Sequence, residues 1–142
     1  MMKVTDEGIA MADSDVNLNM NNCDDGCATF DVQRFLHGLD AIFDAHKAPE
    51  QAEPYLQKAR TEAEHSHDDA GLLTVLNETI GFYRSQGQHT DNLPIIRESL
   101  SIADHLHLQE IDPQAWATTL INAATGMRAA GRYEEAEQLY RQ

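Results

Sequence analysis

Aromatic residues are scarce in this chain of 142 residues, where they make up only 6% of the sequence. Hydrophobic residues nevertheless reach 42%, which is enough for the core of one ordinary domain. Runs of β-branched residues are also absent, whereas Ala, Leu, Glu and Gln are plentiful. Strong helix formers with few large rings suit thin helix-on-helix packing better than a thick sheet core. The composition therefore predicts an all-α protein.

Basic residues are few as well, because 10 Lys and Arg stand against 24 Asp and Glu and give a formal net charge of −14. A surface this acidic repels phosphate groups, so we expect no nucleic-acid partner and no membrane binding. No apolar stretch approaches the roughly 20 residues that span a bilayer, and the N-terminus has no pattern of a secretion signal. We expect a cytoplasmic protein whose partners are basic or neutral.

Only two cysteines occur, Cys23 and Cys27, which predicts no disulfide framework. Three residues separate them rather than the two of a zinc knuckle, and no second pair completes four ligands. We interpret the pair as part of an acidic turn and expect no metal and no cofactor. Both lie in residues 1–28, a polar segment without helical or strand periodicity, which predicts a flexible tail.

Motifs of catalysis are missing too. The sequence contains no Gly-x-Ser-x-Gly, no phosphate-binding glycine loop and no His-Glu-x-x-His, the short signatures of hydrolases, nucleotide-binding enzymes and metalloproteases. The abundant carboxylates have the pattern of solvated helix faces. We therefore expect that the chain is not an enzyme.

From Phe30 onward, apolar residues recur at steps of three and four, as in amphipathic helices. Six helices are expected in one domain, residues 29–142, grouped into hairpins over about 30–67, 68–108 and 113–142. The extra residues between the last two hairpins are expected to form a loop, Gln109 to Pro113.

The expected helix ends carry their own signals. Polar caps and first-turn prolines favour helix starts, and the candidates are Thr29, Pro49, Asp68 or Asp69, Thr90 or Asp91, and Asp112 followed by Pro113. Gly87 and Gly131 are expected to end the third and fifth helices, because glycine readily adopts the left-handed conformation of a helix C-terminus.

The helical segments repeat. Segment 54–67 aligns with segment 94–107 without a gap, at a spacing of 40 residues, through a shared proline, alanine and pair of histidines. Gly87 and Gly131 align at a spacing of 44. Repeating hairpins at a period of this length are typical of helical-repeat proteins, in which each unit buries its apolar face against its neighbours.

The last repeat carries the most specific pattern. The run from Gly131 to Tyr140 (Gly-Arg-Tyr-Glu-Glu-Ala-Glu-Gln-Leu-Tyr) has a turn glycine, an aromatic, a small alanine and a second aromatic, and Asn122 lies in the preceding helix. With these residues the chain resembles the tetratricopeptide repeat family, in particular the longer-period repeats of kinesin light chains. It departs from the family at Lys47, where a turn glycine is expected, and at Asn92, where a small alanine is expected.

The resemblance implies a right-handed solenoid of antiparallel helical hairpins, about three in number with the last one truncated. A general helical-hairpin solenoid is the fallback. Such proteins bind partners, so the implied function is a protein–protein interaction module without catalysis. A sensor or regulatory segment of a larger signalling or transcription-regulating protein is the alternative, and a domain associated with an enzyme is the third.

In this family the first helix of each hairpin lines a concave groove that holds a peptide or a partner helix. The matching positions here are Asn77, Glu78, Gly81, Arg84, Thr118, Ile121, Asn122, Thr125 and Arg128. The asparagines would bond an extended peptide backbone, and the two arginines would hold a carboxylate. The alternative is that all of these are ordinary polar groove residues.

Two further features of the sequence are the aligned histidine pairs and the position at which the sequence stops. His65 and His67 align with His105 and His107 near helix C-termini, and we favour a capping role over a zinc site, because side chains at i and i+2 do not share a helix face. The sequence stops inside the sixth expected helix. We therefore expect a fragment of a longer array, with an exposed C-terminal face able to self-associate.

Overall fold

The computed structural model describes residues 29–46 and 49–142, and all regular secondary structure in these residues is helical. The helices are α1 Val32–Asp44, α2 Ala52–His65, α3 Asp69–Ser85, α4 His89–His105, α5 Leu108–Ile111, α6 Pro113–Ala129 and α7 Tyr133–Tyr140. The predicted all-α class is confirmed. The predicted tail, residues 1–28 with both cysteines, lies outside the described residues.

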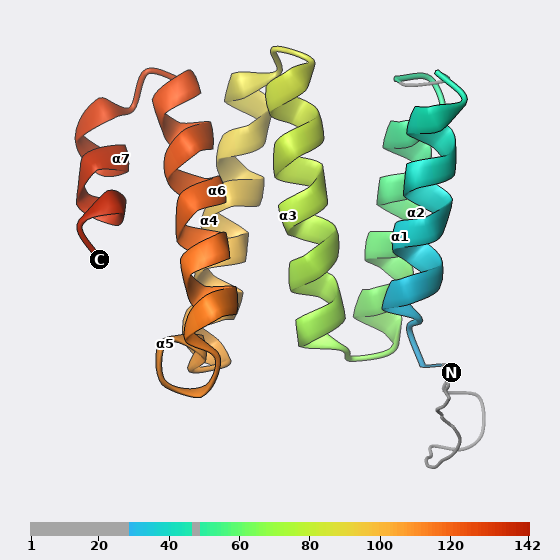
Figure 1. Cartoon of the computed structure of the whole chain (residues 1–142), viewed down its shortest axis with the longest axis horizontal. Coiled ribbons are helices and arrows are strands. Elements are labelled where there is room, and N and C mark those ends of the chain that lie inside the picture. Colours follow the sequence, from blue (N-terminus) through green and yellow to red (C-terminus); the bar gives the residue numbers. More distant parts are fainter. Residues whose placement is uncertain (1–28, 47–48) are drawn as a thin grey trace.

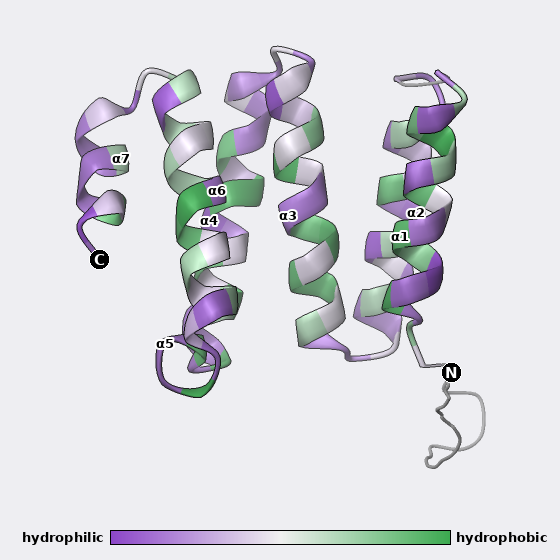
Figure 2. Ribbon diagram, in the orientation of Figure 1, coloured by the Kyte–Doolittle hydropathy of each residue, from purple (hydrophilic) through white to green (hydrophobic). Residues whose placement is uncertain are grey.

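The helices stand side by side in a row, with α1 and α2 at one end and α7 at the other (Figure 1). Each long helix packs on the next one in the chain, α1 on α2, α2 on α3, α3 on α4, α4 on α6 and α6 on α7, and α3 also contacts α6. In the view of Figure 1, α1, α3 and α6 form a near layer, with α2 and α4 behind them. Hydrophobic and hydrophilic residues are interleaved along the helices (Figure 2), as expected where only one stripe of each helix is buried.

Two apolar clusters hold these helices together. The first joins α1, α2 and α3 through fully buried side chains that include Leu39, Leu56 and Leu76. The second joins α3, α4, α6 and α7 through Ile80, Ile96, three alanines and Met127. Buried alanine lets neighbouring helices approach to about 8–10 Å.

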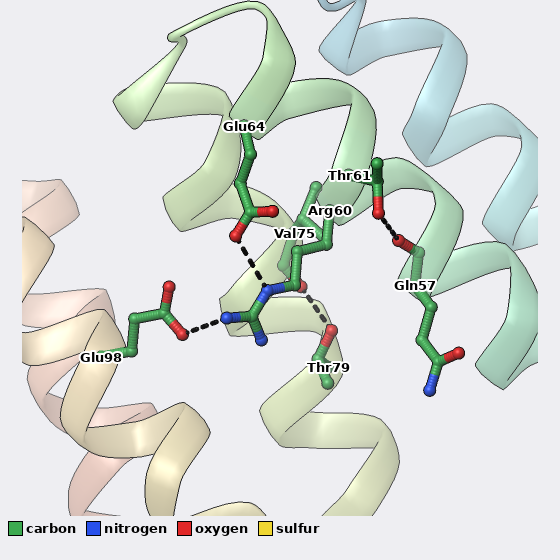
Figure 3. A network of polar contacts seen from close by, with 7 residues as sticks. All are labelled: Gln57, Arg60, Thr61, Glu64, Val75, Thr79 and Glu98. Carbon is green, nitrogen blue, oxygen red and sulfur yellow. Dashed lines mark hydrogen bonds and ion pairs between the residues drawn. The ribbon is translucent and has the colours of Figure 1, made fainter.

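Ion pairs also link helices that are not consecutive in the row, α2 with α4 and α4 with α7. Arg60 of α2 contacts Glu98 of α4 at 2.5 Å and Glu64 of its own helix at 3.2 Å (Figure 3). Arg97 of α4 contacts Glu135 of α7 at 3.3 Å. Because these side chains are between about a third and a half exposed, each pair contributes under about 1 kcal/mol, and the apolar clusters dominate the stability.

Glycine ends two of the long helices, as predicted. Gly87 and Gly131 have φ angles of 72° and 84°, in the left-handed region that glycine adopts without steric cost. In each case the amide two positions beyond the C-cap closes the helix: Gln88 N donates to Tyr83 O at 3.0 Å and Arg132 N to Met127 O at 2.8 Å. These are the bonds of a Schellman motif.

After α1, α2 and α4, a histidine occupies the left-handed position that glycine occupies after α3 and α6. The residue equivalent to Gly87 after α1 is His46, with φ of 58°, so the assignment of that position to Lys47 was wrong by one residue. His67 and His107 follow α2 and α4 with φ of 55° and 56°. Histidine is one of the few residues other than glycine that enter this region with some frequency.

Three predicted helix starts were wrong. Asp31, not Thr29, caps α1 and accepts a bond from Arg34 N at 3.0 Å. Pro49 was expected at the start of α2 but lies three residues before it. Gln51 has a φ angle of −103°, and the hydrogen bond from Glu53 N to Pro49 O is stretched to 3.5 Å. The third error concerns α4, whose cap is Gln88 rather than Thr90 or Asp91, because the chain enters α4 directly from the motif that closes α3.

The remaining caps agree with the sequence. Asp68 accepts a bond from Gly71 N at 2.9 Å and Asp112 from Ala115 N at 3.2 Å. The expected loop between 109 and 113 is instead mostly α5, a single helical turn. Its start places Leu108 against the site described next.

Candidate functional site

An open hollow of about 480 Å³ lies between the near-layer helices α3 and α6. The N-terminal halves of the two helices form its walls, and the segment from Leu106 to Asp112 closes one end. Its lining residues are Ala70, Leu73, Thr74, Asn77, Glu78, Leu106, Leu108, Asp112, Gln114, Ala115, Thr118, Thr119 and Asn122. The lining combines apolar surface with a few polar groups, which is the usual composition of a binding site.

Four of the predicted groove residues meet at this hollow: Asn77, Glu78, Thr118 and Asn122. Asn77 donates a hydrogen bond to Thr119 Oγ1 at 3.3 Å, which ties α3 to α6. Asn77 Oδ1 is buried and has no hydrogen-bond partner among the described residues. A buried acceptor without a partner carries a desolvation cost that a donor placed there would remove.

Glu78 gives the hollow its charge. Desolvation by surrounding protein raises the pKa of its carboxyl group, and the negative charge of Asp40 raises it further, although the side chain still reaches solvent. Asp112 lies at the end of the same hollow. An incoming cation would relieve the repulsion between Glu78 and Asp40.

The other predicted groove residues lie elsewhere. Arg84 and Arg128 are in the last turns of α3 and α6, roughly 9 Å along each helix from the hollow at 1.5 Å per residue. Ile121 is 56% exposed and does not line it. The Thr125 hydroxyl is 3.3 Å from that of Tyr140, on the side of α7.

Sequence reasoning missed the closed end of the hollow. Leu106, Leu108 and Gln114 belong to it, yet the sequence predicted only a loop, Gln109 to Pro113, in this region. The four-residue difference between the two repeat spacings was the available signal, because an insertion beside a groove changes the shape of that groove.

A second hollow of about 470 Å³ lies beside α1 and α2 and is lined in part by Phe30, Phe35 and Tyr55. The Tyr55 hydroxyl donates to Phe35 O at 2.9 Å, and burial raises the pKa of Tyr55. Since this hydroxyl is committed to the backbone, it joins two helices and is not offered to a ligand.

The aligned histidines lie at helix ends. His65 and His105 are the last residues of α2 and α4, and both are exposed. His105 Nε2 is 3.9 Å from Asp69 Oδ2. Within the described ranges, no group of three or more His, Cys, Asp or Glu side chains is placed to hold a metal ion.

Comparison with models of protein families, with curated proteins and with solved structures gave no match. No helix in the described part of the chain is long and apolar enough to cross a membrane. The hollow between α3 and α6, with its polar and acidic lining, is the basis for the functional assignment.

Proposed function

We propose that this chain is a protein–protein interaction module, a right-handed solenoid of helical hairpins of the tetratricopeptide type that binds a peptide segment of its partner. The observation that carries the proposal is the hollow of about 480 Å³ between α3 and α6, where four of the residues implied by the family resemblance lie together. The proposal assigns the module to the cytoplasm and gives it no reaction, metal or cofactor.

The polar groups of the hollow favour an extended peptide. The side-chain amide of Asn122 can bond the backbone of the peptide, and Asn77 Oδ1, which has no partner among the described residues, offers an acceptor. Bonds to the backbone give affinity for any sequence, whereas pockets for side chains give specificity. Leu73, Leu106 and Leu108 supply an apolar surface for one such side chain.

Charge restricts the partner further. Glu78 and Asp112 line the hollow, no Lys or Arg in the described part of the chain does, and the net charge of the sequence is −14. Complementary charge favours encounter with the correct partner and penalises the wrong one. The preferred segment therefore carries Lys or Arg beside an apolar anchor, and acidic segments are rejected.

The proposal is tested by panning the folded protein against a displayed library of linear peptides and titrating the enriched peptides by fluorescence anisotropy. Enriched peptides are expected to contain Lys or Arg and to bind Glu78→Gln and Asn122→Ala about tenfold more weakly, the loss of roughly one hydrogen bond in each variant. No enrichment over a blank surface would contradict the proposal.

Asp104→Asn is the matched control, because it removes one negative charge at an exposed position of α4 outside the hollow. Its affinity should stay within about twofold of the parent, since an exposed charge at a distance is screened by salt. Equal weakening in Asp104→Asn and Glu78→Gln would show that net charge, not the hollow, attracts the peptide.

A further inference from the structure

The hollow between α3 and α6 has an apolar end and a polar end. Leu73 lines it on α3, and Leu106 and Leu108 line its closed end. Asn77 and Glu78 line it about one turn further along α3. In Figure 1, α5 lies at the same end of the row as the starts of α3 and α6. A ligand that lies along the hollow therefore meets first an apolar surface and then a polar one.

The packing of α6 on α3 keeps the two surfaces in register. Both helices run in the same direction (Figure 1), and Asn77 bonds to Thr119 at 3.3 Å. Four residues earlier in each helix, Leu73 and Ala115 line the hollow at one level. Leu73 and Glu78 are five residues apart, which is roughly 7.5 Å along α3 at 1.5 Å per residue.

An extended peptide fits this separation at one spacing of its side chains. Neighbouring side chains of an extended chain point to opposite faces, whereas those at i and i+2 share a face about 7 Å apart. Side chains at i and i+4 also share a face, but their separation of about 13 Å exceeds that of the two surfaces. Only i and i+2 reach both surfaces together.

The polar end is where a basic side chain of the peptide belongs. No hydrogen bond from a described residue stabilises the Glu78 carboxylate, and burial together with the negative charge of Asp40 raises its pKa. Asp40 is on α1, which lies in the same near layer as α3 (Figure 1), so a cation bound at Glu78 is attracted by both carboxylates. At the closed end, Asp112 already accepts a hydrogen bond from Ala115 N.

We propose that the hollow recognises a three-residue pattern in an extended segment of its partner, an apolar residue and a Lys or Arg separated by one residue, in either order. The apolar side chain packs on the leucines of the closed end, and the basic side chain lies between Glu78 and Asp40. The middle residue points to solvent and is unrestricted. This inference rests on the proposed function, because it requires a peptide in the hollow.

The experiment varies the spacing within one peptide. The tightest peptide enriched by panning is resynthesised with zero, one, two or three residues between its apolar and basic residues, and each version is titrated by fluorescence anisotropy. One intervening residue is expected to give about tenfold tighter binding than none or two. Equal affinity at every spacing, or a preference for another spacing, would overturn the inference and leave the proposed function intact. A library without any binding peptide would contradict both.

Substitution of Leu108 tests the position of the apolar side chain. Leu108→Ala is expected to weaken the parent peptide about fivefold to tenfold through lost apolar contact, and to have little effect on a version whose apolar residue is alanine. Ile111→Ala is the matched control, because Ile111 is an exposed residue of the same helical turn and does not line the hollow. Equal effects of the two substitutions would overturn the placement at the closed end.

Substitution of Asp40 tests the position of the basic side chain. Asp40 is exposed, so Asp40→Asn leaves the fold intact, which circular dichroism checks. It is expected to weaken a Lys-containing peptide about twofold to fivefold, as for an exposed ion pair, and to leave a version with norleucine in place of Lys unchanged. Asp104→Asn is the control and should change neither. Equal losses for both peptides, or no loss for either, would overturn the role of Asp40.

Discussion

Ile96 of α4 and Gly126 of α6 are in direct contact, because a Cβ atom added to Gly126 would lie 2.6 Å from Ile96 Cδ1. Ile96 is fully buried and Gly126 is also buried. The contact joins α4 to α6 and fixes how closely these two helices approach. The candidate site depends on this approach, because its two walls, α3 and α6, both pack against α4.

Gly126→Ala should destabilise the protein by about 1–3 kcal/mol, the usual cost of an added methyl group in a packed core. Gly81→Ala is its control, because no atom lies within 4 Å of the new Cβ atom and alanine favours the helix by about 0.5–1 kcal/mol. Urea unfolding measures both. Adding Ile96→Val should recover part of the loss in Gly126→Ala, whereas equal effects of the two alanines would contradict the packing described.

Asp68→Ala should cost about 1 kcal/mol, because Asp68 caps α3 through its bond to Gly71 N. Asp68→Asn keeps the acceptor and should preserve most of this stability. Burial raises the pKa of Asp68 above the ordinary 3.8, so the folded state binds its proton more readily than the unfolded state does. The contribution of Asp68 to stability therefore falls as pH rises between 3.8 and the raised value.

Asn at position 68 has no such proton, so Asp68→Asn should gain stability relative to the parent as pH rises from about 3 to 7. Thermal unfolding at a series of pH values checks this. If the difference in stability between the parent and Asp68→Asn does not depend on pH, burial does not disfavour the charged form of the Asp68 carboxyl group.

His67→Gly and His107→Gly should each stabilise the protein by up to about 1 kcal/mol. Both histidines have positive φ angles, and a side chain in this region costs about 1–2 kcal/mol, partly offset by the greater entropy of glycine in the unfolded chain. Gln88→Gly, at a negative φ of −88°, is the control and should destabilise. Loss of stability in both histidine variants would contradict this prediction and show that the imidazole side chains stabilise the folded state.

Binding of a Lys-containing peptide at the hollow should weaken as pH falls toward the acidic range. A bound cation favours the ionised form of Glu78, and the pKa of this group is raised in the free protein. Binding therefore releases a proton in the window between the free and bound pKa values, and affinity is lost as pH falls through it. Isothermal titration in buffers of different ionisation enthalpy measures the proton, and Glu78→Gln should release none.

Sequence periodicity identified the long helices, because each buries one regular stripe, and it identified Gly87 and Gly131 as helix ends. It failed at Pro49 and at Thr90, since the start of a helix depends on how the preceding helix closes. The family resemblance placed the turn after α1 at Lys47 instead of His46, because histidine carries no turn signal comparable to that of glycine.

The candidate site was only partly predictable for a similar reason. Equivalent positions in two repeats suggested Arg84 and Arg128, and the groove positions of the family suggested Asn77 and Asn122, but neither says where along the helices a hollow opens. That depends on the helical turn at 108–111, which closes one end. The arginines are separated from the hollow by the length of helix that lies between them.

Amide chemical-shift changes, mapped while an enriched basic peptide is titrated into the isotope-labelled protein, locate the peptide site directly. The largest changes are expected in α3 around Asn77 and Glu78, in α6 around Thr118 and Asn122, and in α5. Saturable changes confined to the last turns of α3 and α6 around Arg84 and Arg128, or to the far layer, would contradict a peptide site in the hollow.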